Sequence, residues 1–168
     1  NVERKEIENR IFDSVEELLS TEPARKYEKI IIAEGDGWHR GVLGIVASRI
    51  TQKYGKPTIL ISLNGEEATA SCRSVQGFSI HNLISMCSDL VERFGGHPMA
   101  AGINLKSENV KKFRDEILKT VDKMDVPYPK LEIDLAVNPS KVTSKILNDI
   151  NILKPFGVGN PEPVFALN

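Results

Sequence analysis

The stretch "KIIIAEGDGWHRGVLGIVASRITQKYG", residues 29–55, contains the pattern that decides the fold. It opens with "KIIIAE", a short continuous apolar run flanked by charge, which is typical of a buried β-strand. The glycine-rich segment "GDGWHRG" follows as a loop. Apolar residues then recur at helical spacing until Gly55, a residue type that commonly ends a helix. A strand, a loop and a helix in this order predict an α/β protein.

The segments after Gly55 predict a mixed sheet. "KPTILIS", residues 56–62, is a second apolar strand, and "LNGEE" carries the Asn-Gly pair that tight turns favour. "ATASCRS", residues 68–74, alternates in the way expected of the hairpin partner of that strand. A hairpin pairs its strands antiparallel, whereas a crossover helix joins parallel strands, so both kinds of pairing are expected.

Three amphipathic helices complete the pattern and cover residues 2–20, 80–94 and 107–124. Ser79 is the expected N-cap of the second helix, and Gly95 is expected to stop it. Ser107 is the expected N-cap of the third. A further strand, "AAGINLK", residues 100–106, lies between them. The succession α-β-α-β-β-α-β-α predicts a layered mixed sheet with helices packed on it.

A boundary is expected at "DVPYP", residues 125–129, where two prolines interrupt every period. "KLEIDLAV" then predicts a strand, residues 140–153 a helix, and "KPFGVGNPEPVF" a loop. The chain starts without Met in a helical pattern and stops as a strand begins, so we expect a fragment of a longer protein. The predicted parts are a connecting helix (1–22), an α/β domain (23–126), and a linker with the start of a second domain (127–168).

The composition is typical of a soluble globular protein, with 40% apolar and 27% charged residues among 168. The formal net charge of -1 gives no whole-chain attraction for nucleic acid, so any such binding must be local. The two cysteines, Cys72 and Cys87, do not predict a disulfide framework. No apolar run reaches the roughly 20 residues that span a bilayer. A cytoplasmic protein is therefore expected.

The loop "GDGWHRG" has two interpretations. Backbone N–H groups between a buried strand and a helix start are suited to binding an anion such as phosphate. Alternatively, the glycines only make a tight turn. Trp38 and His39 in this loop are candidates for ligand contact, but Trp38 equally fits a lid over the core, and His39 an ordinary helix cap.

Two further segments carry residue types suited to phosphate. In "ASCRS", Arg73 stands between Ser71 and Ser74, and an arginine fork with hydroxyl donors matches phosphate oxygens. A surface arginine on an alternating strand is the alternative. In "RFGGHPMAAG", residues 93–102, Gly95 and Gly96 expose backbone N–H groups next to His97, a combination able to stabilise charge on a phosphodiester. The alternative is a helix stop before a buried strand.

Metal-ligand signatures are missing from the sequence. It contains no H-x-x-x-H, no D-x-D and no cysteine cluster, and its acidic residues are scattered over helix faces. Residues 1–168 are therefore predicted to bind no metal.

Taken together, "GDGWHRGVLGIVASR", "SCRS" and "RFGGHPMAAG" resemble the DHHA1 domain of the DHH phosphoesterase superfamily. "NVERKEIE" is similar to the helix that joins the metal-binding DHH domain to DHHA1. "ILKPFGVGNPEPVF" is similar to the entry into an OB-fold domain in the RecJ family of that superfamily. The resemblance covers almost the whole chain, and GGHxxAAG is a specific motif.

The resemblance implies a 5′→3′ exonuclease specific for single-stranded DNA, acting in DNA repair and recombination. It implies that Mn²⁺ or Mg²⁺ is held by the DHH domain of the same polypeptide, outside residues 1–168, and that this fragment alone is inactive. It assigns His97 to catalysis at the phosphate near the cleavage point. Phosphate contacts are implied for Ser71, Arg73, Ser74, Gly95 and Gly96, with Trp38 and His39 as further candidates.

Two alternatives remain open at this point. One is a DHH-family phosphodiesterase acting on short oligonucleotides or cyclic dinucleotides, against which the tail "KPFGVGNPEPVF" argues. The other is a nucleic-acid-binding module without catalytic activity. Residues upstream of Asn1 would discriminate the nuclease from the binding module, because D-H-D and D-H-H motifs there support a nuclease and their absence supports a binding module.

Overall fold

The computed structural model describes residues 2–128, 130, 132–157 and 159–168, and it divides the chain into two compact units. The first unit is Asn1–Pro129 and the second is Lys130–Asn168. The structure does not describe Pro129, Leu131 and Val158. The predictions for these positions, a linker, a strand and a loop respectively, therefore lie outside the described residues.

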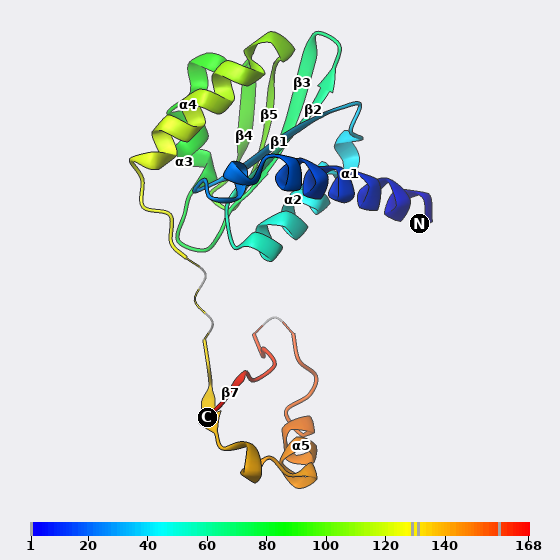
Figure 1. Ribbon diagram of the computed structural model, residues 1–168, viewed down its shortest axis with the longest axis vertical. Helices are drawn as coiled ribbons and strands as arrows, with labels where there is room; N and C mark the ends of the chain where they lie inside the picture. Colours follow the sequence, from blue (N-terminus) through cyan, green and yellow to red (C-terminus); the bar gives the residue numbers. More distant parts are fainter. Residues whose placement is uncertain (1, 129, 131, 158) are drawn as a thin grey trace. The chain divides into compact units, whose positions relative to one another are not determined.

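The first unit is built on one mixed five-stranded sheet, drawn in Figure 1. Its strand order is β1-β2-β3-β5-β4, in which β1 and β2 are parallel and every other pair is antiparallel. Helix α2 (Arg40–Tyr54) makes the crossover from β1 to β2, and Gly55 ends it in the left-handed conformation. The predicted α/β fold with a mixed sheet is confirmed. The strands are β1 (Ile31–Asp36), β2 (Thr58–Asn64), β3 (Glu67–Arg73), β4 (Arg93–His97) and β5 (Ala100–Lys106).

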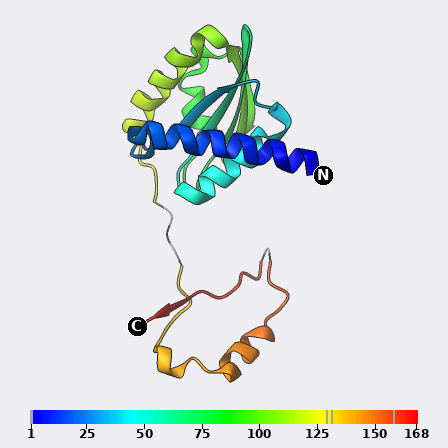
Figure 2. The same cartoon turned by 45° about the vertical axis from the view of Figure 1, so that its right-hand side comes forward.

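Helices cover the two faces of this sheet in pairs, as Figures 1 and 2 show. On one face α1 (Val2–Thr21) and α2 enclose a core that includes Ile31 and Leu60. On the other face α3 (Ile80–Ser85) and α4 (Val110–Asp122) enclose a core that includes Ile32 and Ile59. Neighbouring residues of one strand thus enter opposite cores, because successive side chains of a strand point to opposite faces.

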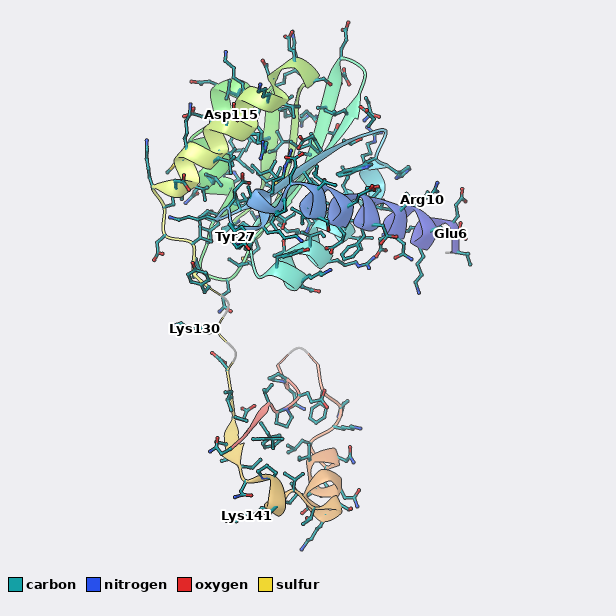
Figure 3. The ribbon with its side chains drawn as sticks, in the orientation of Figure 1. Glu6, Arg10, Tyr27, Asp115, Lys130 and Lys141 are labelled. Carbon is teal, nitrogen blue, oxygen red and sulfur yellow. The ribbon has the colours of Figure 1, made fainter. Side chains whose placement is uncertain are left out.

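Helix α1 forms part of the first unit, because its apolar stripe is buried. Ile11, Val15 and Leu19 have 4%, 0% and 0% of their surfaces exposed in the core shared with α2. Glu6 and Arg10 are exposed and extend from α1 into solvent, as does Asp115 from α4 (Figure 3). The amphipathic pattern of residues 2–20 therefore corresponds to a real buried face.

The helix predicted over residues 80–94 is wrong in its second half. Helix α3 begins after Ser79, whose side chain accepts a hydrogen bond from the backbone N–H of Asn82, as expected for an N-cap. It ends at Ser85, a short 3₁₀ turn (Ser88–Leu90) follows, and the chain then enters strand β4. Phe94 does reach the predicted core, but it does so from a strand, opposite Ile103. Gly95 lies within β4 and does not stop a helix.

The prediction that Ser107 is the N-cap of the following helix is also wrong. It begins a 3₁₀ turn (Ser107–Asn109), and α4 starts only at Val110. The backbone N–H of Ser107 donates to the carbonyl of Glu66, and its hydroxyl is buried without a partner among the described residues. The turn closes the connection from β5, so the residue cannot serve the helix.

The second unit contains less regular structure. Strands β6 (Leu135–Val137) and β7 (Phe165–Leu167) pair in parallel, and helix α5 (Ser144–Asn151) lies between them in sequence. A final strand is thus confirmed, while the predicted strand and helix are shorter than expected. Large apolar side chains such as Leu135 and Ile152 are exposed in this unit. Across the described parts of both units, no helix combines the length and apolar character that a membrane span requires.

Candidate phosphate-binding face

The residues predicted to contact phosphate meet in one row across three strands. In the antiparallel register Arg73 of β3 lies opposite Ala100 of β5, and Ala100 lies opposite His97 of β4. Directly opposed residues project from the same face of a sheet, so all three side chains stand on the face that α2 partly covers. His97 is exposed, and only the small Ala100 separates it from Arg73. The register thus places Arg73 and His97 on one face of the sheet, two strands apart.

The Arg73 side chain is held in place by its neighbours on β3 and α2. Its Nε donates to the Ser48 hydroxyl at 3.1 Å, and its Nη1 donates to the Ser71 hydroxyl at 3.3 Å and the Cys72 carbonyl at 2.8 Å. Its Nη2 lies 2.6 Å from the place where a Cβ on Gly44 of α2 would stand, so the glycine leaves room for the guanidinium. A cation fixed in this way loses little further side-chain entropy on binding phosphate.

A second row lies two residues further along each strand, and its positions on β4 and β5 are glycines without side chains. Gly95 lies opposite Gly102, which lies opposite Ser71. A Cβ added to Gly95 would meet nothing within 4 Å, and one added to Gly102 would meet only the Ala70 carbonyl oxygen at 3.9 Å. The two glycines therefore form an open floor between Ser71 and the sheet edge.

Gly96 differs from these two glycines because the fold itself requires it. Its φ is +148°, and an added Cβ would collide with the carbonyl oxygen of Ala100. It belongs to β4, the outermost strand, so part of the backbone N–H set of this strand faces away from the sheet. The exposure of backbone donors at Gly95 and Gly96 next to His97 stays a prediction.

Ser74, the third side chain of this segment predicted to contact phosphate, is buried in the structure. It lies just past the end of β3, has 6% of its surface exposed, and donates its hydroxyl to the Phe78 carbonyl at 2.6 Å. Its backbone N–H donates to the Met99 carbonyl. These contacts connect the end of the strand to the following loop, and the phosphate contact of Ser74 stays a prediction.

The loop before α2 uses both of its candidate residues structurally. His39 is the N-cap of α2, and its Nδ1 accepts a hydrogen bond from the backbone N–H of Gly41 at 3.2 Å. Trp38 is half-buried against the α1–α2 core, its ring lies over Gly35, and its carbonyl accepts a hydrogen bond from Ser62. Both residues also line a surface hollow of about 360 Å³. These contacts match the helix-cap interpretation of His39 and the lid interpretation of Trp38. Both residues also remain candidates for ligand contact, because they line the hollow.

The structure also contains a third row of polar residues, which was not predicted from the sequence. Arg93 of β4 lies opposite Asn104 of β5, which lies opposite Thr69 of β3, again on the same face. Arg93 was missed because residues 80–94 were interpreted as one helix. The detectable signal was the alternation of Arg93, Gly95 and His97, which has the period of a strand.

The described residues provide no group of three or more His, Cys, Asp or Glu side chains able to hold a metal ion. Cys72 lies beside Arg73 in sequence but enters the opposite core, and burial raises the pKa of its thiol to about 12. A protonated thiol is a poor metal ligand. The described residues thus offer no ligand cluster for Mn²⁺ or Mg²⁺, the ions that the resemblance assigns to a DHH domain outside residues 1–168.

The fold is a mixed-sheet α/β domain in which one face carries Arg73, His97 and a floor of two glycines. The family model for the DHHA1 domain matches residues 27–123, more than half of the chain, and the model for the RecJ OB domain matches residues 133–168. The chain therefore belongs to the DHHA1 domain family. The resemblance to RecJ is confirmed by these matches and by the relatives.

Two curated relatives and one solved structure illustrate the similarity. The chain is 33% identical to the single-stranded-DNA-specific exonuclease RecJ of Bacillus subtilis (strain 168), over 97% of this chain and 21% of the relative. It is 31% identical to the exonuclease of the same name from Escherichia coli (strain K12), over 76% of this chain and 24% of the relative. The crystal structure of RecJ in complex with Mg²⁺ from Thermus thermophilus matches with a TM-score of 0.79 and 27% identity, over 98% of this chain and 25% of that one. The chain thus spans about a quarter or less of these relatives.

Proposed function

We propose that this chain is the substrate-binding half of a RecJ-like 5′→3′ exonuclease that degrades single-stranded DNA in the cytoplasm, in DNA repair and recombination. The observation that carries the proposal is the row formed by Arg73, Ala100 and His97, which sets a fixed cation and an exposed imidazole on one face of the sheet. The similarity to RecJ exonucleases and the match to the RecJ OB domain support it. That second match also favours a RecJ-like enzyme over the shorter phosphodiesterases of the superfamily.

In this proposal each residue of the face has a separate role. Arg73 pairs with a non-bridging phosphate oxygen, and the Ser71 hydroxyl adds a second polar contact. His97 and the backbone N–H groups of Gly95 and Gly96 stabilise the negative charge that develops as the phosphodiester is attacked. The face supplies binding and charge stabilisation but no nucleophile, so this fragment alone is expected to hydrolyse nothing.

The remaining parts of the enzyme are assigned to other segments. Residues 1–22 form the helix that connects to a DHH domain on the same polypeptide, and that domain holds the Mn²⁺ or Mg²⁺ ions. RecJ structures that contain Mg²⁺ or Mn²⁺ support this metal choice. Residues 23–126 form the substrate-binding domain, and residues 127–168 form the linker and the start of the OB-fold domain. OB-folds add affinity for single strands by stacking and backbone electrostatics.

The test for Arg73 is its alanine variant in the full-length protein. Arg73→Ala should weaken binding of single-stranded DNA about tenfold or more, because a hydrogen bond to a charged group contributes about 1.5–3 kcal/mol. It should also lower the slope of log affinity against log salt by about 0.7, the value for one single-strand phosphate contact. Fluorescence anisotropy without divalent metal measures both. Lys112→Ala, which removes an exposed charge on the opposite face of the sheet, is the matched control. Binding unchanged by Arg73→Ala would rule out the phosphate contact.

The test for His97 separates turnover from affinity. His97→Ala in the full-length enzyme should lower kcat by a factor of about 100 or more, in the range found when one oxyanion donor is removed, while DNA affinity changes far less. Single-turnover kinetics on a 5′-labelled single strand measure the chemical step directly. Equal losses in affinity and turnover would contradict the catalytic assignment.

A further inference from the structure

We infer that Arg93, Asn104 and Thr69 form a second subsite, which binds a phosphodiester further along the same DNA strand. The inference rests on the proposed function, because it takes the row of Arg73 and His97 as the first subsite. The new subsite lies on the same face of β3, β5 and β4, at the other end of the glycine floor. Its ligand class is the sugar-phosphate backbone of a single strand.

A surface hollow marks the subsite. It has a volume of about 340 Å³ and is lined by both floor glycines, Gly95 and Gly102, together with Arg93, Asn104 and Thr69. The three polar side chains make no hydrogen bond or ion pair within the part of the chain that the structure describes. Their polar groups therefore remain available to a ligand. This distinguishes Arg93 from Arg49 and Arg114, which are paired with acidic side chains.

The distance between the two rows separates their ligands. They are four residues apart along each strand, which corresponds to about 13 Å at the usual rise of a β-strand. One phosphate group is too small to be held by both rows, so a strand lying along β5 places different phosphates over each. The floor between them has no side chains on two strands, and this lets a nucleotide backbone approach the sheet closely.

The chemistry of the three residues matches a backbone contact. Arginine binds phosphate oxygens bidentately, and the amide of Asn104 and the hydroxyl of Thr69 offer donors to phosphate or sugar oxygens. Thr69 also lines the adjoining hollow at the start of α2, where Arg40 is exposed. Thr69 thus borders both hollows, and the exposed carboxylate of Glu67 also lines the second one, so the phosphate contacts of the proposed subsite are confined to the hollow at Arg93.

Arg93→Ala in the full-length protein tests the charge of this subsite. Binding is measured by fluorescence anisotropy without divalent metal, using a thymidine oligonucleotide of about 12 nucleotides, within the range of known single-strand sites, and a dinucleotide. The variant should weaken binding of the longer strand about tenfold and lower its salt slope by about 0.7, with a smaller loss for the dinucleotide. Lys112→Ala should leave both unchanged, because it lies on the opposite face.

Gly102→Val tests the floor independently of charge. Valine is favoured in strands, and a side chain here stands in the hollow without meeting a protein atom closer than 3.9 Å to its Cβ. The variant should therefore keep the unfolding temperature and lose at least tenfold in affinity for the longer strand. Unchanged binding in a folded Gly102→Val protein would overturn the inference.

The outcomes separate this inference from the proposed function. If Arg93→Ala behaves like Lys112→Ala while Arg73→Ala weakens binding, the second subsite is wrong and the proposed function stands. An equal loss for the dinucleotide and the longer strand would also overturn the second subsite, because it would place Arg93 at the first phosphate. If neither arginine variant affects binding, the proposed function itself fails.

Discussion

Leu19→Ala should strongly destabilise the first unit, because α1 contributes to a closed core. Leu19 is fully buried in the core shared by α1, α2 and the sheet. Removing a leucine side chain from such a position loses its transfer free energy and leaves a cavity, and the cost is about 2–5 kcal/mol of unfolding free energy. The matched control is Leu18→Ala on the same helix, since Leu18 is only partly buried against this core.

The expected shift is large enough to measure by thermal unfolding. A loss of about 3 kcal/mol corresponds to a decrease in Tm of roughly 10–15 °C for a unit of this size. Scanning calorimetry, or circular dichroism followed against temperature, should show this shift for Leu19→Ala and a shift less than half as large for Leu18→Ala. Small and equal shifts for both variants would refute the reasoning, because α1 would then be a connector that unfolds without affecting the domain.

Two further predictions concern ionisable groups in the first unit. Cys72, with its pKa raised to about 12 by burial, should not react with a thiol reagent at pH 8 until the protein unfolds, so reactivity of the native protein at the unfolded rate would contradict its burial. Burial raises the pKa of Glu28 above its ordinary value of 4.5 although Arg114 pairs with it at 3.3 Å. The folded state therefore binds this proton more tightly than the unfolded state, so the contribution of Glu28 to stability falls as pH rises through and above 4.5. Compared by Tm between pH 4 and 7, Glu28→Gln should gain on the unaltered protein as pH rises, and a difference in the opposite direction would contradict this sign.

Local patterns were sufficient to predict most elements of the first unit. The apolar run before residue 35, the helix ended by Gly55 and the Asn-Gly turn all appear where the sequence places them. Each of these signals depends on neighbours within a few residues, and the structure keeps them because the global fold agrees with them. The strand that carries Ser71 and Arg73 was predicted for the same reason.

The error over residues 80–94 shows where local patterns fail. Cys87, Leu90, Val91 and Phe94 do pack toward the core formed with α4, as a helical face would. The periodicity is compatible with either element over so short a stretch, and pairing with β5 decides the outcome for Arg93–His97. Strand pairing depends on residues distant in sequence, so propensity alone could not detect it.

The sequence by itself determined which residue types are available for phosphate and on which strand Ser71 and Arg73 lie. Only the tertiary structure decided which residues act together. It inserts β5 between β3 and β4, and the core-facing alternation of these strands sets a register in which Arg73 and His97, 24 positions apart, share a row. A slip of one residue would turn these side chains to the opposite face, so the register that buries Cys72 and Ile103 also creates the candidate site. The same register places Arg93 on this face, while the hydroxyl of Ser74 donates to the Phe78 carbonyl.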